Sequence, residues 1–212
     1  MTTKRLMGIT SAYLALILFL AACGGSAPAP ETEPTPEVAD GELITYVGEV
    51  DGDLFIALNL VELDGAEEER AIRAYLCDGA DVSVWMTDQF NGDEVTLVSG
   101  DTRIALTSIN SASGAVSLAG GAEVPFTANL ATGEAGLYRA EGTFEGQDYV
   151  GGWIVLNNGQ QRGAITLDGQ VLENPTLDLT TGEVETSVGT LSTVRCFINP
   201  WTGERICRTM SQ

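Results

Sequence analysis

The side chains of this chain best suited to covalent chemistry are its four cysteines, and the last two lie in a segment with the pattern of a β-hairpin. In CFINPWTGERIC, which runs from Cys196 to Cys207, pairing Phe197 with Ile206 leaves residues 200–203 as a four-residue loop. This register places the two cysteines opposite each other, at the separation that a disulfide needs in a pair that is not hydrogen-bonded. The sequence therefore predicts a C-terminal hairpin closed by a Cys196–Cys207 disulfide.

Cys77 is left without an obvious partner. It is interpreted either as a small buried apolar side chain of a strand or as a partner of Cys196 or Cys207. Redox catalysis is not expected, because the chain has no C-x-x-C motif and no histidine, and its only lysine is Lys4. The folded part of the chain therefore has no lysine or histidine to lower a thiol pKa.

Trp201 stands beside Pro200 in the predicted hairpin loop. A tryptophan displayed on a closed loop is a suitable recognition element, although the same side chain could equally fold back over one end of the domain. Trp85 and Trp153 lie within expected strands, where core packing is the default for a large aromatic side chain. Trp201 is thus the candidate recognition residue.

Composition excludes several classes of function. Without histidine the chain has no histidine base, no histidine zinc ligand and no Ser-His-Asp triad. Ten Lys and Arg stand against 30 Asp and Glu, giving a net charge of −20, so nucleic acid is not an expected partner. There is no G-x-S-x-G, P-loop or G-x-G-x-x-G motif. We do not expect an enzyme.

Carboxylate pairs are the remaining route to acid–base chemistry, as in glycoside hydrolysis. The candidates are Asp78 with Asp81 and Asp88 with Glu94, all in or beside expected turns. Aspartate is favoured in turns because its side chain accepts local backbone hydrogen bonds. Two acidic turns, Asp51-Gly52-Asp53 and Asn91-Gly92-Asp93-Glu94, gather oxygen ligands, but neither fits the D-x-[DN]-x-[DN]-G-x₅-E calcium loop. We interpret these carboxylates as turn residues and expect no metal and no cofactor.

The N-terminus has the order of an export signal. Lys4 and Arg5 precede an apolar stretch, residues 13–20, that is too short to span a bilayer comfortably. The stretch ends in Leu-Ala-Ala-Cys, which resembles the lipobox of bacterial lipoproteins. The resemblance implies that residues 1–22 are removed as a signal peptide and that Cys23 becomes the diacylglyceryl-modified, N-acylated first residue. A plain signal peptide beside a cysteine is the alternative.

The lipobox resemblance also implies where the protein acts. Two or three acyl chains anchor a protein stably, so we expect it on the extracytoplasmic side of a cell membrane or envelope. Residues 23–42 hold four of the seven prolines and predict an extended tether that could lift the domain up to roughly 60 Å. Loss of residues 1–22 removes two positive charges and no negative one, taking the net charge from −20 to −22. Solvation is the simplest explanation of this charge, with cation binding or adaptation to salt as alternatives.

From residue 43 the chain alternates apolar and polar residues, with turn signals every eight to twelve positions, which is typical of an antiparallel β-meander. Asn91-Gly92-Asp93 is the strongest hairpin signal and is predicted to join two strands directly. One segment, residues 67–76, has good helix formers but also strand alternation, and its neighbours favour a strand. The expected strands are 43–50, 54–63, 71–77, 82–90, 94–98, 102–109, 115–118, 122–130, 136–144, 148–156 and 161–167.

This many short strands predict an all-β domain over residues 43–167, a barrel-like meander with a two-sheet sandwich as the alternative. Residues 168–212 are predicted to form a C-terminal β extension that includes the disulfide hairpin. The motifs IRAYLCDG, ending at Gly79, and GLYR, ending at Arg139, resemble β-rich domains of secreted and membrane-tethered proteins of actinobacteria and related phyla. The resemblance covers about residues 44–165, supports the fold and location, and implies no activity or catalytic residue.

These features together predict a monomeric, non-catalytic binding or envelope-associated module, held to the membrane by the lipid on Cys23. Its partner would be an envelope protein or a small ligand. The alternative is a small-ligand carrier that uses a barrel interior, and a carboxylate-dependent hydrolase is third. A carrier predicts an apolar cavity, a recognition module predicts a filled interior and an exposed patch near Trp201, and a hydrolase predicts two carboxylates that converge in a cleft.

Overall fold

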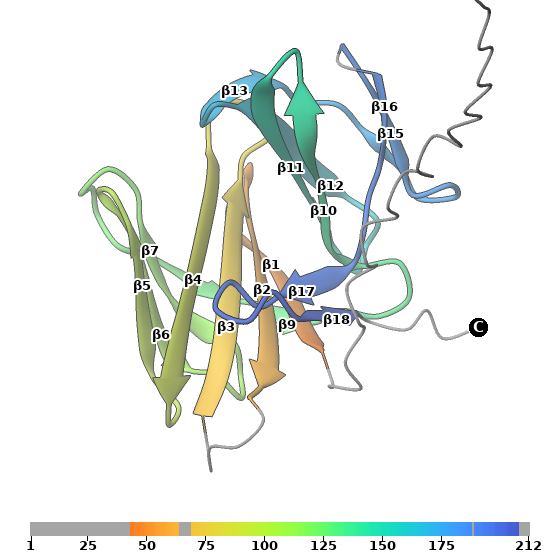
Figure 1. Ribbon diagram of the computed structural model, residues 1–212. Helices are drawn as coiled ribbons and strands as arrows, with labels where there is room; N and C mark the ends of the chain where they lie inside the picture. Colours follow the sequence, from red (N-terminus) through yellow and green to blue (C-terminus); the bar gives the residue numbers. More distant parts are fainter. Residues whose placement is uncertain (1–42, 64–68, 188, 208–212) are drawn as a thin grey trace, which may run out of the picture. The chain divides into compact units, whose positions relative to one another are not determined.

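The computed structural model describes residues 43–63, 69–187 and 189–207, in which strands and turns are present and no helix occurs (Figure 1). These residues belong to one compact unit. The all-β prediction is confirmed. The predicted signal peptide, Cys23 and the predicted tether lie outside the described residues.

The central sheet has five antiparallel strands in the order β4-β3-β2-β1-β9. Residues 69–76, the described part of the segment for which a helix was the alternative, lie in the strand β3, which pairs with a strand on either side. The strands of the sheet are β1 (Ile44–Asp51), β2 (Leu54–Glu62), β3 (Glu69–Cys77), β4 (Ser83–Asn91) and β9 (Asn129–Leu130).

The middle strands of this sheet are buried on both faces, which explains why their sequences are almost continuously apolar. In β2, every residue before the last is buried. On one face Ile56 packs into a first core, and on the other face Phe55 packs into a second core. Asn59 is the polar exception, and its Oδ1 accepts a hydrogen bond of 2.8 Å from the Thr45 hydroxyl on β1. Burial on both faces removes the alternation that marks a half-exposed strand.

A second sheet, in the order β5-β6-β7-β8, covers the first core from the other side. The chain passes between the two sheets at Ala128, because β8 pairs with β7 whereas β9, which follows it, pairs with β1. The strands thus follow one another round the first core, but β4 and β5 are not paired and no closed barrel forms. The antiparallel meander is confirmed, and the sheets remain open as in a sandwich. The strands of this sheet are β5 (Val95–Ser99), β6 (Thr102–Ser108), β7 (Ser113–Ser117) and β8 (Val124–Thr127).

The turn Asn91-Gly92-Asp93 is the corner at which the chain leaves the central sheet, so the prediction that it closes a hairpin was wrong. Gly92 does have the positive φ, +84°, that this sequence favours. However, the carbonyl of Asp93 accepts a hydrogen bond of 2.9 Å from the Ile109 amide, and its Oδ1 accepts one of 3.1 Å from the Asn110 side chain. These bonds tie the corner to the β6–β7 connection rather than to β4. A local turn signal does not specify which sheet the following strand joins.

A third sheet, in the order β10-β11-β12-β13, packs on the opposite face of the central sheet through the second core. Its first hairpin is a two-residue turn in which Glu145 and Gly146 have φ of +52° and +82°. The bounds predicted for two of its strands, 136–144 and 161–167, coincide with β10 and β12. The strands are β10 (Gly136–Phe144), β11 (Gln147–Val155), β12 (Gln161–Leu167) and β13 (Gln170–Glu173).

Trp153 on β11 accounts for two glycines within this sheet. Gly163 lies directly opposite it on β12, and a Cβ at either Gly163 or Gly151 would overlap the indole ring. Trp153 is fully buried, and its Nε1 donates a hydrogen bond of 2.9 Å to the Pro175 carbonyl, which fixes the ring. Glycine, which is otherwise unfavourable inside a strand, is needed here to make room for the indole.

The C-terminal part of the chain forms two smaller sheets. The strands β14 (Leu177–Asp178), β15 (Glu183–Thr186) and β16 (Gly189–Ser192) form one sheet, which packs on the other side of Trp153 in a third core. The strands β17 (Cys196–Ile198) and β18 (Arg205–Cys207) form the predicted hairpin. A single bridge between Val194 and Arg139 connects the chain before this hairpin to β10.

Candidate functional site

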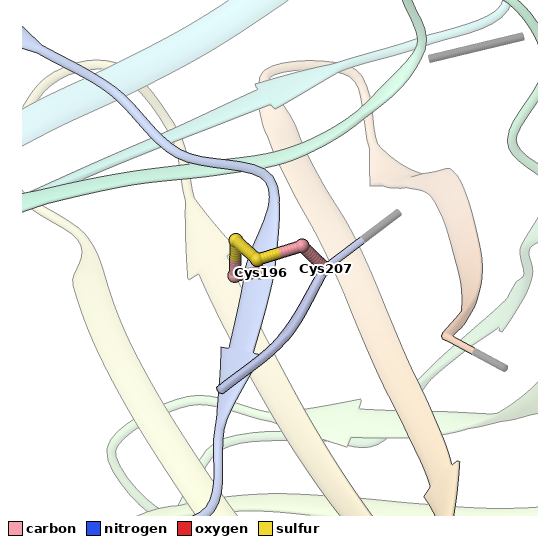
Figure 2. The surroundings of a disulfide bond; sticks show 2 residues. All are labelled: Cys196 and Cys207. Carbon is pink, nitrogen blue, oxygen red and sulfur yellow. A yellow bond between two sulfur atoms is a disulfide. The ribbon is translucent and has the colours of Figure 1, made fainter. Parts of the chain in front are cut away.

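Cys196 and Cys207 form the disulfide predicted from the hairpin register (Figure 2). Phe197 lies opposite Ile206, and the two cysteines lie opposite each other with their Cα atoms 4.0 Å apart. Such a short separation is typical of a pair that is not hydrogen-bonded. The disulfide therefore closes the open end of a hairpin whose loop is at the other end.

One buried residue, Asn199, holds the loop of the hairpin. Its Oδ1 accepts hydrogen bonds from the amides of Trp201 and Thr202, at 2.9 and 3.3 Å. Its own amide donates to the Glu204 carbonyl and its carbonyl accepts from the Gly203 amide, both at 2.8 Å. Only 2% of Asn199 is exposed, so water competes little for these four hydrogen bonds. The backbone of the loop is consequently fixed.

Trp201 is displayed by this fixed loop. Half of the residue, 50%, is exposed, whereas Trp153 is fully buried. The structure therefore places Trp201 at the surface rather than folded back against the domain. A large amphipathic side chain on an ordered loop can bind a partner without first being ordered.

Apolar side chains on the inner face of the hairpin dock it on the domain. Phe197, which is 0% exposed, and Ile206 pack against Leu43, Val61 and Ala71 in a fourth core. Burial of each of the two hairpin side chains contributes about 1.5–3 kcal/mol. The hairpin is thus packed against the central sheet on its inner face.

Arg73 on β3 adds a polar link between the central sheet and the hairpin. Its Nη2 donates a hydrogen bond of 2.5 Å to the Ile198 carbonyl, and its guanidinium lies 5.0 Å from the centre of the Phe197 ring. Burial, and secondarily the positive charge of Arg139, lowers the pKa of Arg73 to about 10, while Glu141 opposes this shift. Nη1 of Arg73 is buried without a hydrogen-bond partner among the described residues. Sequence reasoning missed Arg73, although an arginine at an inward position of an otherwise apolar strand could have indicated it.

The other two tryptophans offer no open platform for a ligand. Trp153 is enclosed in the third core. Trp85 on β4 is stacked on Tyr75 with ring centres 4.2 Å apart, and the Arg139 guanidinium lies 4.4 Å from the Trp85 ring. A stacked ring and a guanidinium this close leave little of the indole face for another molecule. Both residues pack in the protein, as was the default expectation.

Cys77 is buried and not part of a disulfide, so its interpretation as a small core side chain is confirmed and its pairing with a hairpin cysteine was wrong. Its Sγ accepts a hydrogen bond of 3.4 Å from the Gly79 amide. Burial raises the pKa of the thiol, which keeps it protonated and unreactive.

One carboxylate of each candidate catalytic pair bonds to nearby backbone. Asp78 accepts hydrogen bonds of 2.8 and 2.9 Å from the amides of Ala80 and Val82, as expected of an aspartate in a turn. Asp88 lies within β4 rather than beside a turn, and it accepts a hydrogen bond of 2.8 Å from the Gln89 amide.

A cavity of about 540 Å³ at the corner between β4 and β5 gathers three carboxylates, of which the sequence had pointed only to Asp93, as part of an acidic turn. Glu62, Glu69 and Asp93 line it together with Arg70, which donates to the Gly92 carbonyl and lies 3.9 Å from the Asp93 carboxylate. These residues come from three separate segments, so no spacing in the sequence predicts that they lie together. An arginine paired with one of the acids makes the cavity a polar recess.

Two smaller cavities lie elsewhere. One of about 300 Å³ is lined by Tyr138, by Arg195 and by both hairpin cysteines. Another, of about 220 Å³, is lined by Arg162 and its neighbours. None of these three cavities is lined by a residue of the first core. Side chains of the central sheet and of the β5-β6-β7-β8 sheet fill that core.

Within the described ranges, no group of three or more Asp, Glu, Cys or His side chains is placed to hold a metal ion. The same ranges contain no helix long and apolar enough to cross a membrane.

Comparison with known proteins gives no family or relative. No protein-family model matches the chain, and neither a curated protein nor a solved structure shows significant similarity to it.

Proposed function

We propose that this protein is a non-catalytic recognition module, anchored by a lipid on Cys23 and presented on the extracytoplasmic side of its membrane. The disulfide hairpin is its recognition element. The observation that carries this proposal is the exposure of Trp201, 50%, on a loop whose backbone is held by the buried side chain of Asn199.

The rigidity of the hairpin supports recognition rather than a purely structural role. The disulfide closes one end, Asn199 fixes the other, and Phe197 packs the inner face on the domain. A loop ordered in advance loses little conformational entropy on binding, and tryptophan is among the residues that most often dominate binding energy. A structural hairpin has no need of an exposed indole.

The order of segments along the chain supports presentation from a membrane. The Leu-Ala-Ala-Cys motif ending at Cys23 precedes a proline-rich stretch, and the folded domain follows that stretch. A tether of this kind allows a domain to reach partners away from the lipid surface.

The two other functions considered have less support. A carrier needs space in its interior, but the first core is filled by fully buried side chains such as Ile72, Leu97 and Ile104. A hydrolase needs two converging carboxylates, and one member of each candidate pair, Asp78 and Asp88, accepts hydrogen bonds from nearby backbone amides instead.

An affinity capture from the native envelope tests the proposal. The full-length tagged chain, its Trp201→Ala variant and a matched Val98→Ala variant are used as baits under oxidising conditions. Val98 is 65% exposed and controls for the loss of any surface apolar side chain. We expect one dominant protein that is retained by wild type and Val98→Ala and lost with Trp201→Ala. Absence of any protein partner, or equal capture by all three baits, would refute the proposal.

A further inference from the structure

Most arginines in the described part of the chain lie against aromatic rings of the protein itself. Five of the seven described arginines place the guanidinium 4.4–5.1 Å from the centre of an aromatic ring. The pairs are Arg70 on Phe90, Arg73 on Phe197, Arg139 on Trp85, Arg162 on Phe55 and Arg195 on Tyr138.

The side chains of these arginines are also largely buried. Those of Arg70, Arg139 and Arg162 are 24%, 17% and 31% exposed, and Arg73 is buried. Arg103, at 51%, is more exposed and lies 3.7 Å from the Glu123 carboxylate. With 30 acidic residues against ten basic ones, the solvated surface is consequently dominated by carboxylates.

Trp201 differs from the rings that carry an arginine. It is half exposed, and among the described residues no guanidinium lies over it. Two charged residues of opposite sign, Glu204 and Arg205, follow the loop three and four positions after Trp201. Tryptophan has the aromatic face that attracts a cation most strongly.

We propose that the partner presents a cationic segment, and that an arginine of that segment stacks on Trp201. This inference rests on the proposed recognition function and names the chemistry of its partner. The net charge, −20 for the whole sequence and −22 without residues 1–22, accelerates the approach of a positive segment and disfavours an acidic one. The exposed indole then supplies the contact that bulk charge alone does not, in the same arrangement that the protein uses five times within its own fold.

Peptide binding to the full-length chain tests this inference. The probes are a fluorescent Arg-Gly octapeptide, in which the two residues alternate, and the same peptide with citrulline in place of arginine. Citrulline keeps the shape of arginine and removes its charge. Dissociation constants are measured by fluorescence anisotropy at low and physiological salt, for wild type, Trp201→Ala, Trp201→Phe, Glu204→Gln and the control Val98→Ala. Thermal unfolding verifies that each variant is folded.

We expect the arginine peptide to bind wild type and Val98→Ala equally, and to bind Trp201→Ala roughly threefold to thirtyfold more weakly. Trp201→Phe should lose less, Glu204→Gln should lose affinity mainly at low salt, and the citrulline peptide should bind at least tenfold more weakly than the arginine peptide. Unchanged binding by Trp201→Ala would overturn the inference, because bulk charge would then explain the affinity. Equal binding of the two peptides, or no binding by wild type, would also overturn it. A Trp201-dependent envelope partner, captured as described above, would in that case leave the recognition function standing.

Discussion

Reduction of the Cys196–Cys207 disulfide should destabilise the folded protein by a predictable amount. The two cysteines are 11 residues apart in the sequence. In the chain-entropy description, a closed loop of this length removes about 9.5 cal/mol/K of conformational entropy from the unfolded chain, which is about 3 kcal/mol at 25 °C. For a protein of this size, such a loss lowers the midpoint of thermal unfolding by about 6–12 °C.

The stability of the hairpin against local opening should fall by the same amount. Its amides are protected only while the hairpin is formed, and 3 kcal/mol corresponds to an increase of about 100-fold in the population of open hairpin. We therefore expect the Phe197 and Ile206 amides, which lie in the hydrogen-bonded register, to exchange with solvent about 100-fold faster after reduction.

Urea unfolding and hydrogen exchange, each with and without a phosphine reductant, measure these two effects. Cys77 is buried and forms no disulfide, so the Cys77→Ala variant should respond to the reductant as wild type does. A Cys196→Ala/Cys207→Ala variant should reproduce the reduced protein. A change below about 1 kcal/mol, with unchanged exchange of the hairpin amides, would show that loop closure does not stabilise this hairpin.

Three further substitutions test packing in the second, third and fourth cores. Gly163→Ala should lower the free energy of unfolding by about 3 kcal/mol, because a Cβ there overlaps the fixed indole of Trp153. In a Trp153→Phe background the same substitution should lower it clearly less. Equal losses in the two backgrounds, measured as a double-mutant cycle, would contradict the overlap. Phe197→Ala should free the hairpin from the domain, seen as rapid exchange of its amides with the disulfide intact, whereas retained protection would show that the fourth core does not dock it. Burial raises the pKa of Cys77 above its ordinary 9.0, so above that pH the unfolded chain releases a proton that the native protein keeps, and stability falls. Cys77→Ala should lose less stability than wild type between about pH 8 and 10, and parallel losses by denaturant titration would contradict this attribution.

Local patterns in the sequence predicted most of the secondary structure. The bounds of β10 and β12 agree with the prediction, and the register that pairs Phe197 with Ile206 was deduced from the positions of two cysteines and a four-residue loop. These features depend on neighbours along the chain, such as side-chain alternation and the φ preferences of turn residues, and a sequence records them directly.

The Asn91-Gly92 corner shows where such reasoning fails. The turn residues specify a reversal of direction, and Gly92 adopts the expected positive φ. Whether the next strand returns beside β4 or enters another sheet depends on the bonds between Asp93 and the β6–β7 connection. Those partners lie 16 and 17 residues away, so the local sequence does not contain the information.

The residues around the candidate site divide in the same way. The sequence alone determined the hairpin, its disulfide and the position of Trp201 in its loop, because all three follow from spacing within twelve residues. Tertiary structure decided that Trp201 is exposed, that Phe197 faces the central sheet, and that Arg73, more than 120 residues earlier, reaches the Ile198 carbonyl. Exposure and long-range contact depend on how separate sheets pack, and packing is fixed by the shape and burial of side chains that are distant in the sequence.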